Sequence, residues 1–209
     1  MRRCLYGLTR DLHLYLGLFG SPFVLVFAVS VFFLVHAWLP RLGSPTPNVR
    51  VVPGLAQAGA LRTLSGRPLI DALGPILERA GVRGEIGFVS HLVKDDALLI
   101  PVTVPGRATT VTLPLAGGDA TIVTREEGFA SALATLHRSP GEHAPAIRMN
   151  WFWMKAWRGL ADTTAYLILF ISVSGIGLWY VLRAERRVGF ALIVAGAFSF
   201  FGLAYALSH

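Results

Sequence analysis

Residues 12–39 read LHLYLGLFGSPFVLVFAVSVFFLVHAWL, and this apolar stretch decides the fold. It lies between Arg10-Asp11 and Arg41, and no lysine, arginine, aspartate or glutamate interrupts it. About 20 apolar residues cross the hydrocarbon of a bilayer as a helix, because each residue advances the helix by about 1.5 Å. The stretch therefore predicts a complete transmembrane helix, which Pro22 is expected to kink without breaking. Its most polar members are His13, Ser21, Ser30 and His36.

A cleaved signal peptide is the alternative interpretation of the same stretch. Val35-His36-Ala37 places small residues where a signal peptidase could cut. However, the apolar part of such signals usually spans only about 7–15 residues. The much longer run here favours a membrane anchor that is retained.

Two more apolar stretches, residues 160–182 and 188–207, predict a second and a third transmembrane helix. Residues 183–187 read RAERR and form a short basic loop between them, so the two helices are expected to make a hairpin. Tryptophans cluster just before the second helix, and another ends the first, as expected of an aromatic belt at one headgroup layer. These tryptophans, which are expected to position helices rather than to bind a ligand, are Trp38, Trp151, Trp153 and Trp157.

The positions of the basic residues predict the orientation in the membrane, because lysine and arginine are enriched on the cytoplasmic side. Residues 1–11 and the loop at 183–187 each carry three arginines, so both are expected in the cytoplasm. Residues 40–150 then face outward, into the periplasm if the cell is Gram-negative, and the membrane is the bacterial cytoplasmic (inner) one. Lys155 and Arg158 weaken this asymmetry, although they adjoin a long loop, which counts for little in the rule.

The net charge of +7 does not indicate a nucleic-acid-binding protein, because of where the charge lies. Residues 40–150 carry 11 Lys or Arg and 9 Asp or Glu, a balance of 11 − 9 = +2, while the rest of the chain carries 8 and 3, or +5. The excess adjoins the apolar stretches and fits lipid headgroups, so no nucleic-acid partner is expected. Cys4 is the only cysteine, which excludes an internal disulfide and a thiolate metal cluster within one chain.

Small residues recur inside the predicted helices, often four positions apart. This spacing lets helix backbones approach closely, so it favours a packed bundle within the chain, a homodimer, or a contact with a partner in a membrane complex. The residues are Gly17, Ser21, Ser172, Ser174, Gly175, Gly177, Ala191, Ala195, Gly196, Ser199 and Gly202.

The outward segment contains a compact α+β unit at about residues 61–139. A helix is predicted over Pro68–Ala80, ended by Gly81, unless Pro75 opens a shorter helix. Short runs with alternating apolar residues and turn signals between them follow, which predicts an antiparallel β-meander. A closing helix at about 126–136 is expected to cover the sheet. The helix residues expected to face the sheet are Leu69, Leu73, Ile76, Ala80, Phe129, Leu133 and Leu136, and the strand runs centre on Ile86 and Phe88, Leu98 to Val104, Thr109 to Leu113, and Ile122 to Thr124.

Three motifs on this layout resemble the PepSY-associated transmembrane family. Residues 10–18 read RDLHLYLGL and are similar to that family's opening signature, while residues 174–180 read SGIGLWY and are similar to its signature late in a span. Leu136-His137-Arg138 resembles the family's Leu-His pair. The resemblance implies three transmembrane helices with an inserted PepSY-like domain. Some relatives are iron-uptake reductases that carry heme b, others have no assigned chemistry, and the longer reductase-like members have four or more spans.

Histidines near the predicted spans are the first functional candidates, because ionisable groups at membrane depth are costly. His13 and His36 lie near opposite ends of the first helix, about 35 Å and about 140° apart, so they cannot serve one site. A bis-histidine heme needs a second imidazole, and on the outer side His36 has His137, His143 and His209 as candidate partners. His13 would need a second copy of the chain. One outer heme b per chain is the simplest redox hypothesis. The candidate heme ligands of the chain as a whole are His36, His137, His13 and His209.

The other polar residues carry simpler interpretations. His137 and His143 are six residues apart around Glu142, Pro140 and Gly141, which matches no tight chelating pattern, so no separate metal site is predicted. Asp162 is expected to pair with Arg158, and Asp11 with Arg10, as interfacial ion pairs. No nucleophile elbow, phosphate loop, zinc-binding helix or dinucleotide fingerprint occurs.

The sequence leaves two functions open. It does not indicate whether the protein is an enzyme. The first is a heme-b-linked electron-transfer subunit that serves an outer acceptor such as a ferric siderophore. The alternative is a non-catalytic anchor or accessory subunit whose PepSY-like domain engages a peptide, a peptidase or a membrane-complex partner.

Overall fold

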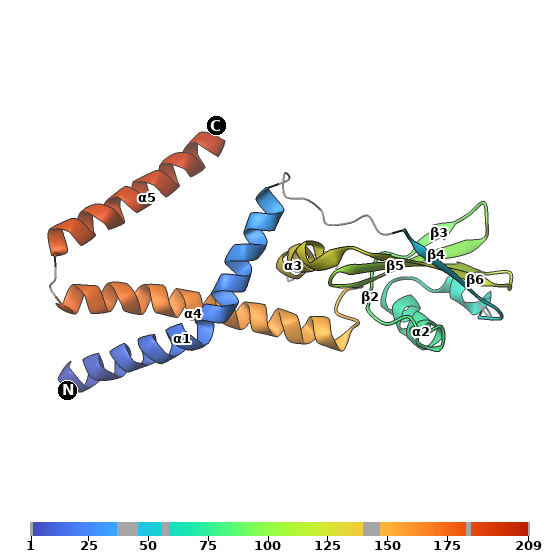
Figure 1. Cartoon of the computed structure of the whole chain (residues 1–209), viewed down its shortest axis with the longest axis horizontal. Coiled ribbons are helices and arrows are strands. Elements are labelled where there is room, and N and C mark those ends of the chain that lie inside the picture. The colour runs from blue at the N-terminus through green and yellow to red at the C-terminus, as the bar shows by residue number, and fades with distance from the viewer. Residues whose placement is uncertain (1, 37–45, 56–58, 140–146, 183–184, 209) are drawn as a thin grey trace. The chain divides into compact units, whose positions relative to one another are not determined.

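The structure, a computed structural model, describes residues 2–36, 46–55, 59–139, 147–182 and 185–208. Three long helices, α1 (Arg2–Val35), α4 (Phe152–Leu182) and α5 (Arg186–Ser208), accompany a domain built from shorter helices and an antiparallel sheet (Figure 1). Each of the three is long and apolar enough to cross a membrane. Their large apolar side chains are mostly exposed, which suits a surface covered by lipid. The chain is therefore a multi-pass membrane protein of the α+β class.

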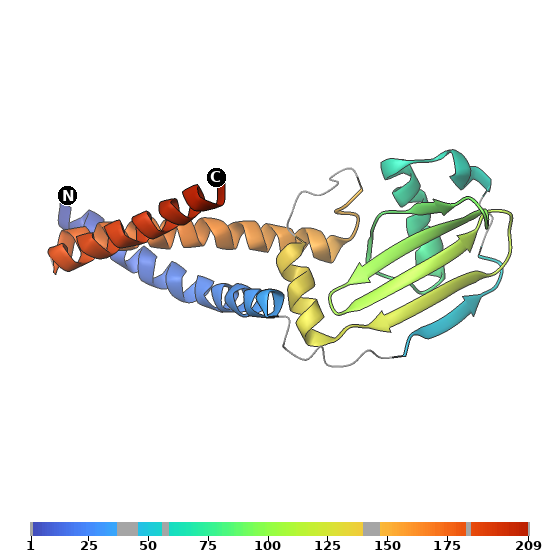
Figure 2. The ribbon, with the colours of Figure 1, turned by 90° about the horizontal axis from the view of Figure 1, so that it is seen from above.

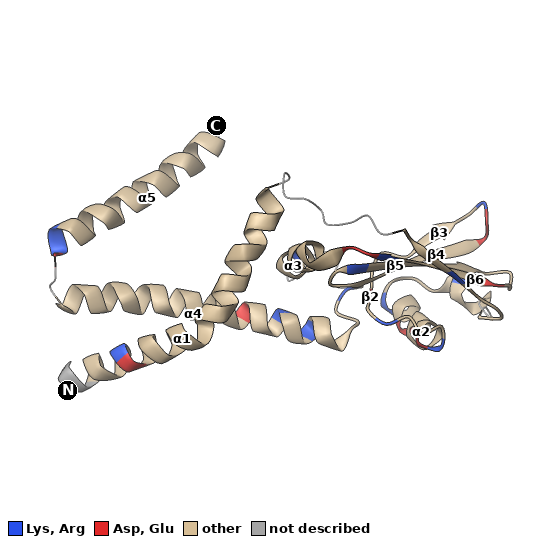
Figure 3. Ribbon diagram, in the orientation of Figure 1, with Lys and Arg blue, Asp and Glu red and all other residues tan. Residues whose placement is uncertain are grey.

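The three long helices agree with the predicted spans but begin earlier. α1 continues through Pro22, so the proline does not break it. Residues 37–39 of the predicted span, and the loop residues 183–184, lie outside the described part of the chain. α4 has 31 residues, or about 46 Å of helix, against about 30 Å of hydrocarbon. Its first turns therefore extend beyond the hydrocarbon, which is where its charged residues occur (Figure 3).

The two predicted interfacial ion pairs are present. Arg10 Nη2 lies 2.8 Å from an Asp11 carboxylate oxygen, and Arg158 Nε lies 4.0 Å from one of Asp162. Both aspartates thus have a structural explanation that requires no proton transport.

Two glycines provide close helix contacts within the α1, α4 and α5 segments. A Cβ added at Gly20 would lie 3.7 Å from a Leu167 methyl carbon, and one added at Gly189 would collide with the Trp179 ring. In contrast, a Cβ at Gly177 or Gly202 would meet nothing within 4 Å. Gly20 and Gly189 are not among the small residues singled out from the sequence. Of the glycines that were, only Gly175 has a close neighbour among the described residues, with His13 Cε1 at 3.3 Å from an added Cβ, and packing of the others against a partner stays a prediction.

The domain contains a six-stranded antiparallel sheet in the order β1-β6-β5-β4-β2, with β3 also paired to β4. Its three long central strands confirm the predicted meander. Two strands were missed: β1 lies before residue 61, where the predicted unit began, and β3 has only three residues. Phe88 was wrongly placed in a strand, since it lies between β2 and β3 and is 70% exposed. The strands are β1 (Asn48–Val52), β2 (Glu85–Ile86), β3 (Ser90–Leu92), β4 (Ala97–Val104), β5 (Arg107–Pro114) and β6 (Ala120–Glu126).

The core of the domain lies between α2 (Gly66–Arg79) and one face of the sheet (Figures 1 and 2). Pro75 lies inside α2, so it does not open a shorter helix. The helix ends as predicted, with Gly81 at φ +71° just beyond it, a conformation that glycine adopts without steric cost. A short 3₁₀ helix, η1 (Gly59–Thr63), adds to this core. Its most deeply buried side chains include Leu73, Ile100, Val111 and Leu113.

The closing helix α3 (Gly128–Arg138) does not cover the sheet as predicted. Leu133 is buried, but Phe129 is 74% exposed. The reason is the turn between β4 and β5, where a Cβ added at Gly106 would lie 3.2 Å from Ala132 Cβ. α3 therefore packs across the end of this hairpin instead of along the sheet face (Figure 2).

A clasp made by Met149 and Asn150 joins the edge strand β2 to the start of α4. Asn150 Oδ1 accepts the Ile86 N–H at 2.9 Å, and Asn150 Nδ2 donates to the Ile86 carbonyl at 2.8 Å. The Met149 N–H donates to Glu85 Oε1 at 3.1 Å. The asparagine side chain thus bonds both backbone groups of Ile86, as a neighbouring strand would, and ties the sheet to the transmembrane helix.

Replacing Asn150 by alanine is expected to destabilise the domain by about 1–3 kcal/mol, because both backbone groups of Ile86 lose their partner in a half-buried place. Thermal unfolding of the full chain in detergent, followed by near-UV circular dichroism, measures this as a lower melting temperature. Asn48→Ala, at an exposed residue of β1, is the matched control. Equal melting temperatures for both variants would contradict the role of the clasp.

Candidate functional site

His13 of α1 is held by a buried serine of α4. Its Nδ1 lies 2.7 Å from Ser174 Oγ, and the serine residue is only 8% exposed. The next residue is Gly175, where an added Cβ would lie 3.3 Å from His13 Cε1. The absence of a side chain at Gly175 therefore lets the imidazole approach α4. These three residues are called the His13 cluster.

His137 of α3 is held in the same way by a buried serine of α1. Its Nδ1 lies 2.8 Å from Ser30 Oγ, and Ser30 is only 2% exposed. The Phe27 ring contacts the imidazole edge at a centroid distance of 5.7 Å. Figure 2 shows α3 beside this end of α1. His137, Ser30 and Phe27 are called the His137 cluster.

The hydrogen bonds of the two serines are compatible with one tautomer of each histidine in particular. Ser174 Oγ donates to the Ile171 carbonyl at 3.2 Å, and Ser30 Oγ donates to the Phe27 carbonyl at 2.6 Å. A hydroxyl has one hydrogen, so a serine that donates to the carbonyl of its own helix can only accept from the histidine. In that arrangement Nδ1 carries the proton of the neutral ring, and Nε2 keeps its lone pair. Within the described residues, no hydrogen bond reaches Nε2 of either ring.

The last turn of α3 is also fixed to α4. Trp157 Nε1 donates to the Leu136 carbonyl at 2.9 Å, and the Trp157 ring stacks on Phe27 at 5.7 Å. The carbonyl just before His137 and the aromatic ring beside it are thus both held by one tryptophan. This contact confirms the prediction that the tryptophans position helices, as far as Trp157 is concerned.

His36 directly follows α1, and it packs against a different face of that helix from the face where Ser30 holds His137. Its ring stacks on Phe32 at a centroid distance of 4.2 Å, and its Nδ1 donates to the Phe32 carbonyl at 3.1 Å. Ser30, which holds His137, is two residues before Phe32, so the two positions are about 200° apart around the helix. The pairing of His36 with His137 at one iron stays a prediction, and the structure instead favours a separate site at His137.

Three further histidines complete the six of the chain. His209, His143 and Glu142 lie outside the described residues. His91 lies on β3, with its Nε2 3.6 Å from an Asp96 carboxylate oxygen, at the exposed surface of the domain. Among the described residues, no three His, Cys, Asp or Glu side chains gather as a metal site.

Sequence reasoning missed the two serines as functional residues. Ser174 was noted only as a small packing residue, and Ser30 only as one of the few polar residues in an apolar run. A polar side chain buried in a membrane helix usually hydrogen-bonds a neighbouring helix, and this was the signal that could have singled them out.

Comparisons with known proteins give no indication of function, so the two histidine clusters are the basis for a proposal. No protein-family model, no curated protein and no solved structure matches this chain. The fold and the clusters define an α+β multi-pass membrane protein with two histidines that are each oriented by a buried serine.

Proposed function

We propose that this protein is a heme-b-linked electron-transfer subunit of the bacterial inner membrane that takes part in iron uptake from ferric siderophores. The observation that carries the proposal is the same arrangement in the His13 and His137 clusters, where a buried serine fixes Nδ1 and leaves Nε2 as a ligand atom. Metal-ligating histidines commonly use their second nitrogen in this way. The likeness to the PepSY-associated transmembrane family adds support.

The residues present fit a heme ligand at each cluster. Both imidazoles are half-buried, so the protein shields one side of the ring. The serine bond fixes the ring plane and makes Nε2 a better electron donor. Heme b, when bound, would supply one-electron oxidation and reduction. His13 and His137 would each provide one ligand nitrogen. The second imidazole would come from another copy of the chain at the His13 cluster, and from His209 or another copy of the chain at the His137 cluster.

The proposed orientation places the N-terminus and the loop between α4 and α5 in the cytoplasm, and the PepSY-like domain in the periplasm. It is supported by the arginines at both cytoplasmic segments, two of which begin α5. In this orientation the His13 cluster lies toward the electron-donating side and the His137 cluster toward an outer acceptor.

Replacing Ser30 or Ser174 by alanine is expected to weaken heme binding about 10–100-fold at the corresponding histidine, which is the usual cost of removing such a hydrogen bond. Alanine is small and apolar, so the helices keep their packing. Heme titration of the purified apoprotein measures the change. The control is Ser131→Ala, whose hydroxyl bonds Glu127 at the surface of α3. Unchanged affinity in both cluster variants would contradict the role of the serines.

The role in iron uptake is tested in cells that lack the native gene and receive ferric siderophore as the only iron source. Growth should be restored by the normal chain and not by a chain in which His13 and His137 are both alanine. Equal growth with both chains would contradict the proposed role, provided that the variant reaches the membrane in equal amounts.

A second candidate function is an accessory subunit whose domain binds a peptide or protein partner. It is favoured by a cavity of about 310 Å³ in the domain, lined mostly by apolar side chains such as Leu69, Leu98 and Leu115. Arg62 and His91 line the same cavity, and both pair with Asp96. Cellular function that survives replacement of every histidine would favour this candidate over electron transfer.

A further inference from the structure

A second cavity of about 310 Å³ lies where the domain meets the start of α4. Its polar lining comes from the edge of the sheet, from the last turn of α3, and from the segment before α4. The cavity does not include the histidine clusters, so a ligand bound in it would be independent of the proposed heme sites. The lining residues with charged or hydroxyl groups are Glu85, Thr103, Thr135, Arg138, Ser139 and Arg148.

Opposite charges face this cavity without pairing to each other. Arg138 and Arg148 supply two guanidinium groups, while Glu85 supplies one carboxylate and is only 6% exposed. Among the described residues, no ion pair joins Glu85 to either arginine. Within the described part of the chain, the side chain of Glu85 has one hydrogen bond, from the Met149 N–H to its Oε1. Among the described residues no fully buried side-chain oxygen lacks a partner, so the second carboxylate oxygen of Glu85 is accessible from the cavity, where a cation could reach it.

In the orientation proposed above, the cavity lies at the depth of lipid headgroups. Met154, which lines it, is in the first turn of α4, and α4 is longer than the hydrocarbon of a bilayer. Trp151 and Trp153 flank this level, as expected at a membrane interface. A volume of about 310 Å³ is at the small end of ligand pockets, which fits a headgroup better than a whole lipid.

We propose that this cavity binds the phosphoethanolamine headgroup of a membrane phospholipid. The phosphate would lie between Arg138 and Arg148, because guanidinium groups bind phosphate oxygens with two parallel hydrogen bonds. The ammonium group would face Glu85 and neutralise its buried charge. An anionic lipid such as phosphatidylglycerol has the phosphate but not the ammonium, so it would leave Glu85 uncompensated.

The test is native mass spectrometry of the delipidated full chain in detergent, titrated with phosphatidylethanolamine or phosphatidylglycerol. The normal chain should prefer phosphatidylethanolamine by about tenfold, the expected size of one charge-assisted hydrogen bond. Glu85→Gln keeps an oxygen that accepts the Met149 N–H and removes the charge, so the preference should disappear. Arg148→Gln should weaken binding of both lipids by about tenfold.

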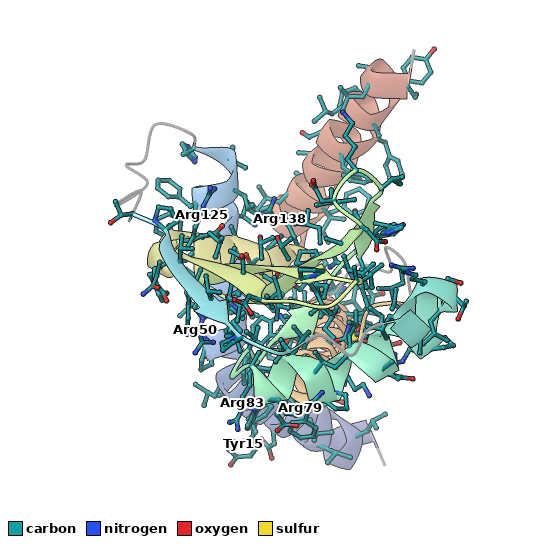
Figure 4. The ribbon with its side chains drawn as sticks, turned by 90° about the vertical axis from the view of Figure 1, so that its right-hand side faces the viewer. Tyr15, Arg50, Arg79, Arg83, Arg125 and Arg138 are labelled. Atoms are coloured by element: carbon teal, nitrogen blue, oxygen red, sulfur yellow. The ribbon has the colours of Figure 1, made fainter. Side chains whose placement is uncertain are left out.

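The control is Arg83→Gln, an exposed arginine of the same domain that Figure 4 places well away from Arg138; it should change neither affinity. Titration with soluble glycerophosphoethanolamine distinguishes binding of a membrane lipid from binding of a free phosphoester. Binding of the soluble compound as tight as that of the lipid would overturn the assignment to a membrane lipid. Equal affinity of the normal chain for both lipids would also overturn it, as would a preference that survives Glu85→Gln. If Glu85→Gln fails to fold, unchanged binding to Arg148→Gln still contradicts the site.

Discussion

Replacing His13 and His137 together by alanine should abolish heme binding, and each single replacement should remove about half of the bound heme. The expectation follows from the separate anchoring of the two rings. Ser174 of α4 holds His13, and Ser30 of α1 holds His137. Neither serine can substitute for the other, so loss of one imidazole leaves the other site intact. Heme content per chain, measured on the purified protein by the pyridine hemochrome method, reports the change.

His91→Ala is the matched control for these two replacements. It removes an imidazole from the domain surface, where its neighbour is Asp96. Heme content should stay at the level of the normal chain. A loss with His91→Ala equal to that with His137→Ala would mean that folding of the domain, and not ligation, controls heme content. Full heme content in the double variant would show that neither His13 nor His137 is a heme ligand.

Replacing Gly175 by leucine should remove heme from the His13 cluster as completely as His13→Ala does. A Cβ alone at this position would lie 3.3 Å from His13 Cε1, closer than most such contacts in proteins. The rest of a leucine side chain would push the ring away from Ser174 and break the bond that sets the Nε2 lone pair. Overpacking of this kind typically costs about 1–3 kcal/mol, so local displacement is expected and not unfolding of the helices.

Gly177→Leu tests whether the effect depends on position within the same helix. An added Cβ at Gly177 meets nothing within 4 Å, so this variant should keep its heme. Both variants place the same side chain in α4, which equalises effects on membrane insertion. Heme content and the absorption spectrum should separate them clearly. Equal loss in the two variants would contradict the specific contact between Gly175 and His13.

The transmembrane helices could be predicted from the sequence because hydrocarbon thickness sets their length and composition. The apolar runs at 12–39, 160–182 and 188–207 could be recognised without knowledge of tertiary structure. The ends were less accurate, since α4 begins at Phe152 and not near Leu160. Its first turns carry Lys155 and Arg158, and such interfacial turns have no strong apolar signal.

The domain was predictable where local patterns are strong and not where distant pairing decides. Strands β4, β5 and β6 are joined by short turns, so their order followed from the sequence. β1 pairs with β6 across about 70 residues, and nothing local indicates that pairing. The position of α3 depends on the close approach of Ala132 to Gly106, a contact that its apolar stripe does not reveal.

The candidate site was likewise predictable in its local features and not in its contacts between distant segments. The sequence singled out His13, His36 and His137 as polar residues near apolar helices, which is a local property. It could not show that Ser174 and Ser30 hold two of these rings, because each contact joins segments more than 100 residues apart. The tautomers and the separation of His36 from His137 depend on those contacts.

The most direct test of the proposed function is the optical spectrum of the full chain, expressed with ample heme and purified in detergent. We predict a Soret band that shifts on reduction and is absent from the chain in which His13 and His137 are alanine. A normal chain that folds, as judged by circular dichroism, and shows no Soret band would contradict heme binding and with it the proposed electron transfer.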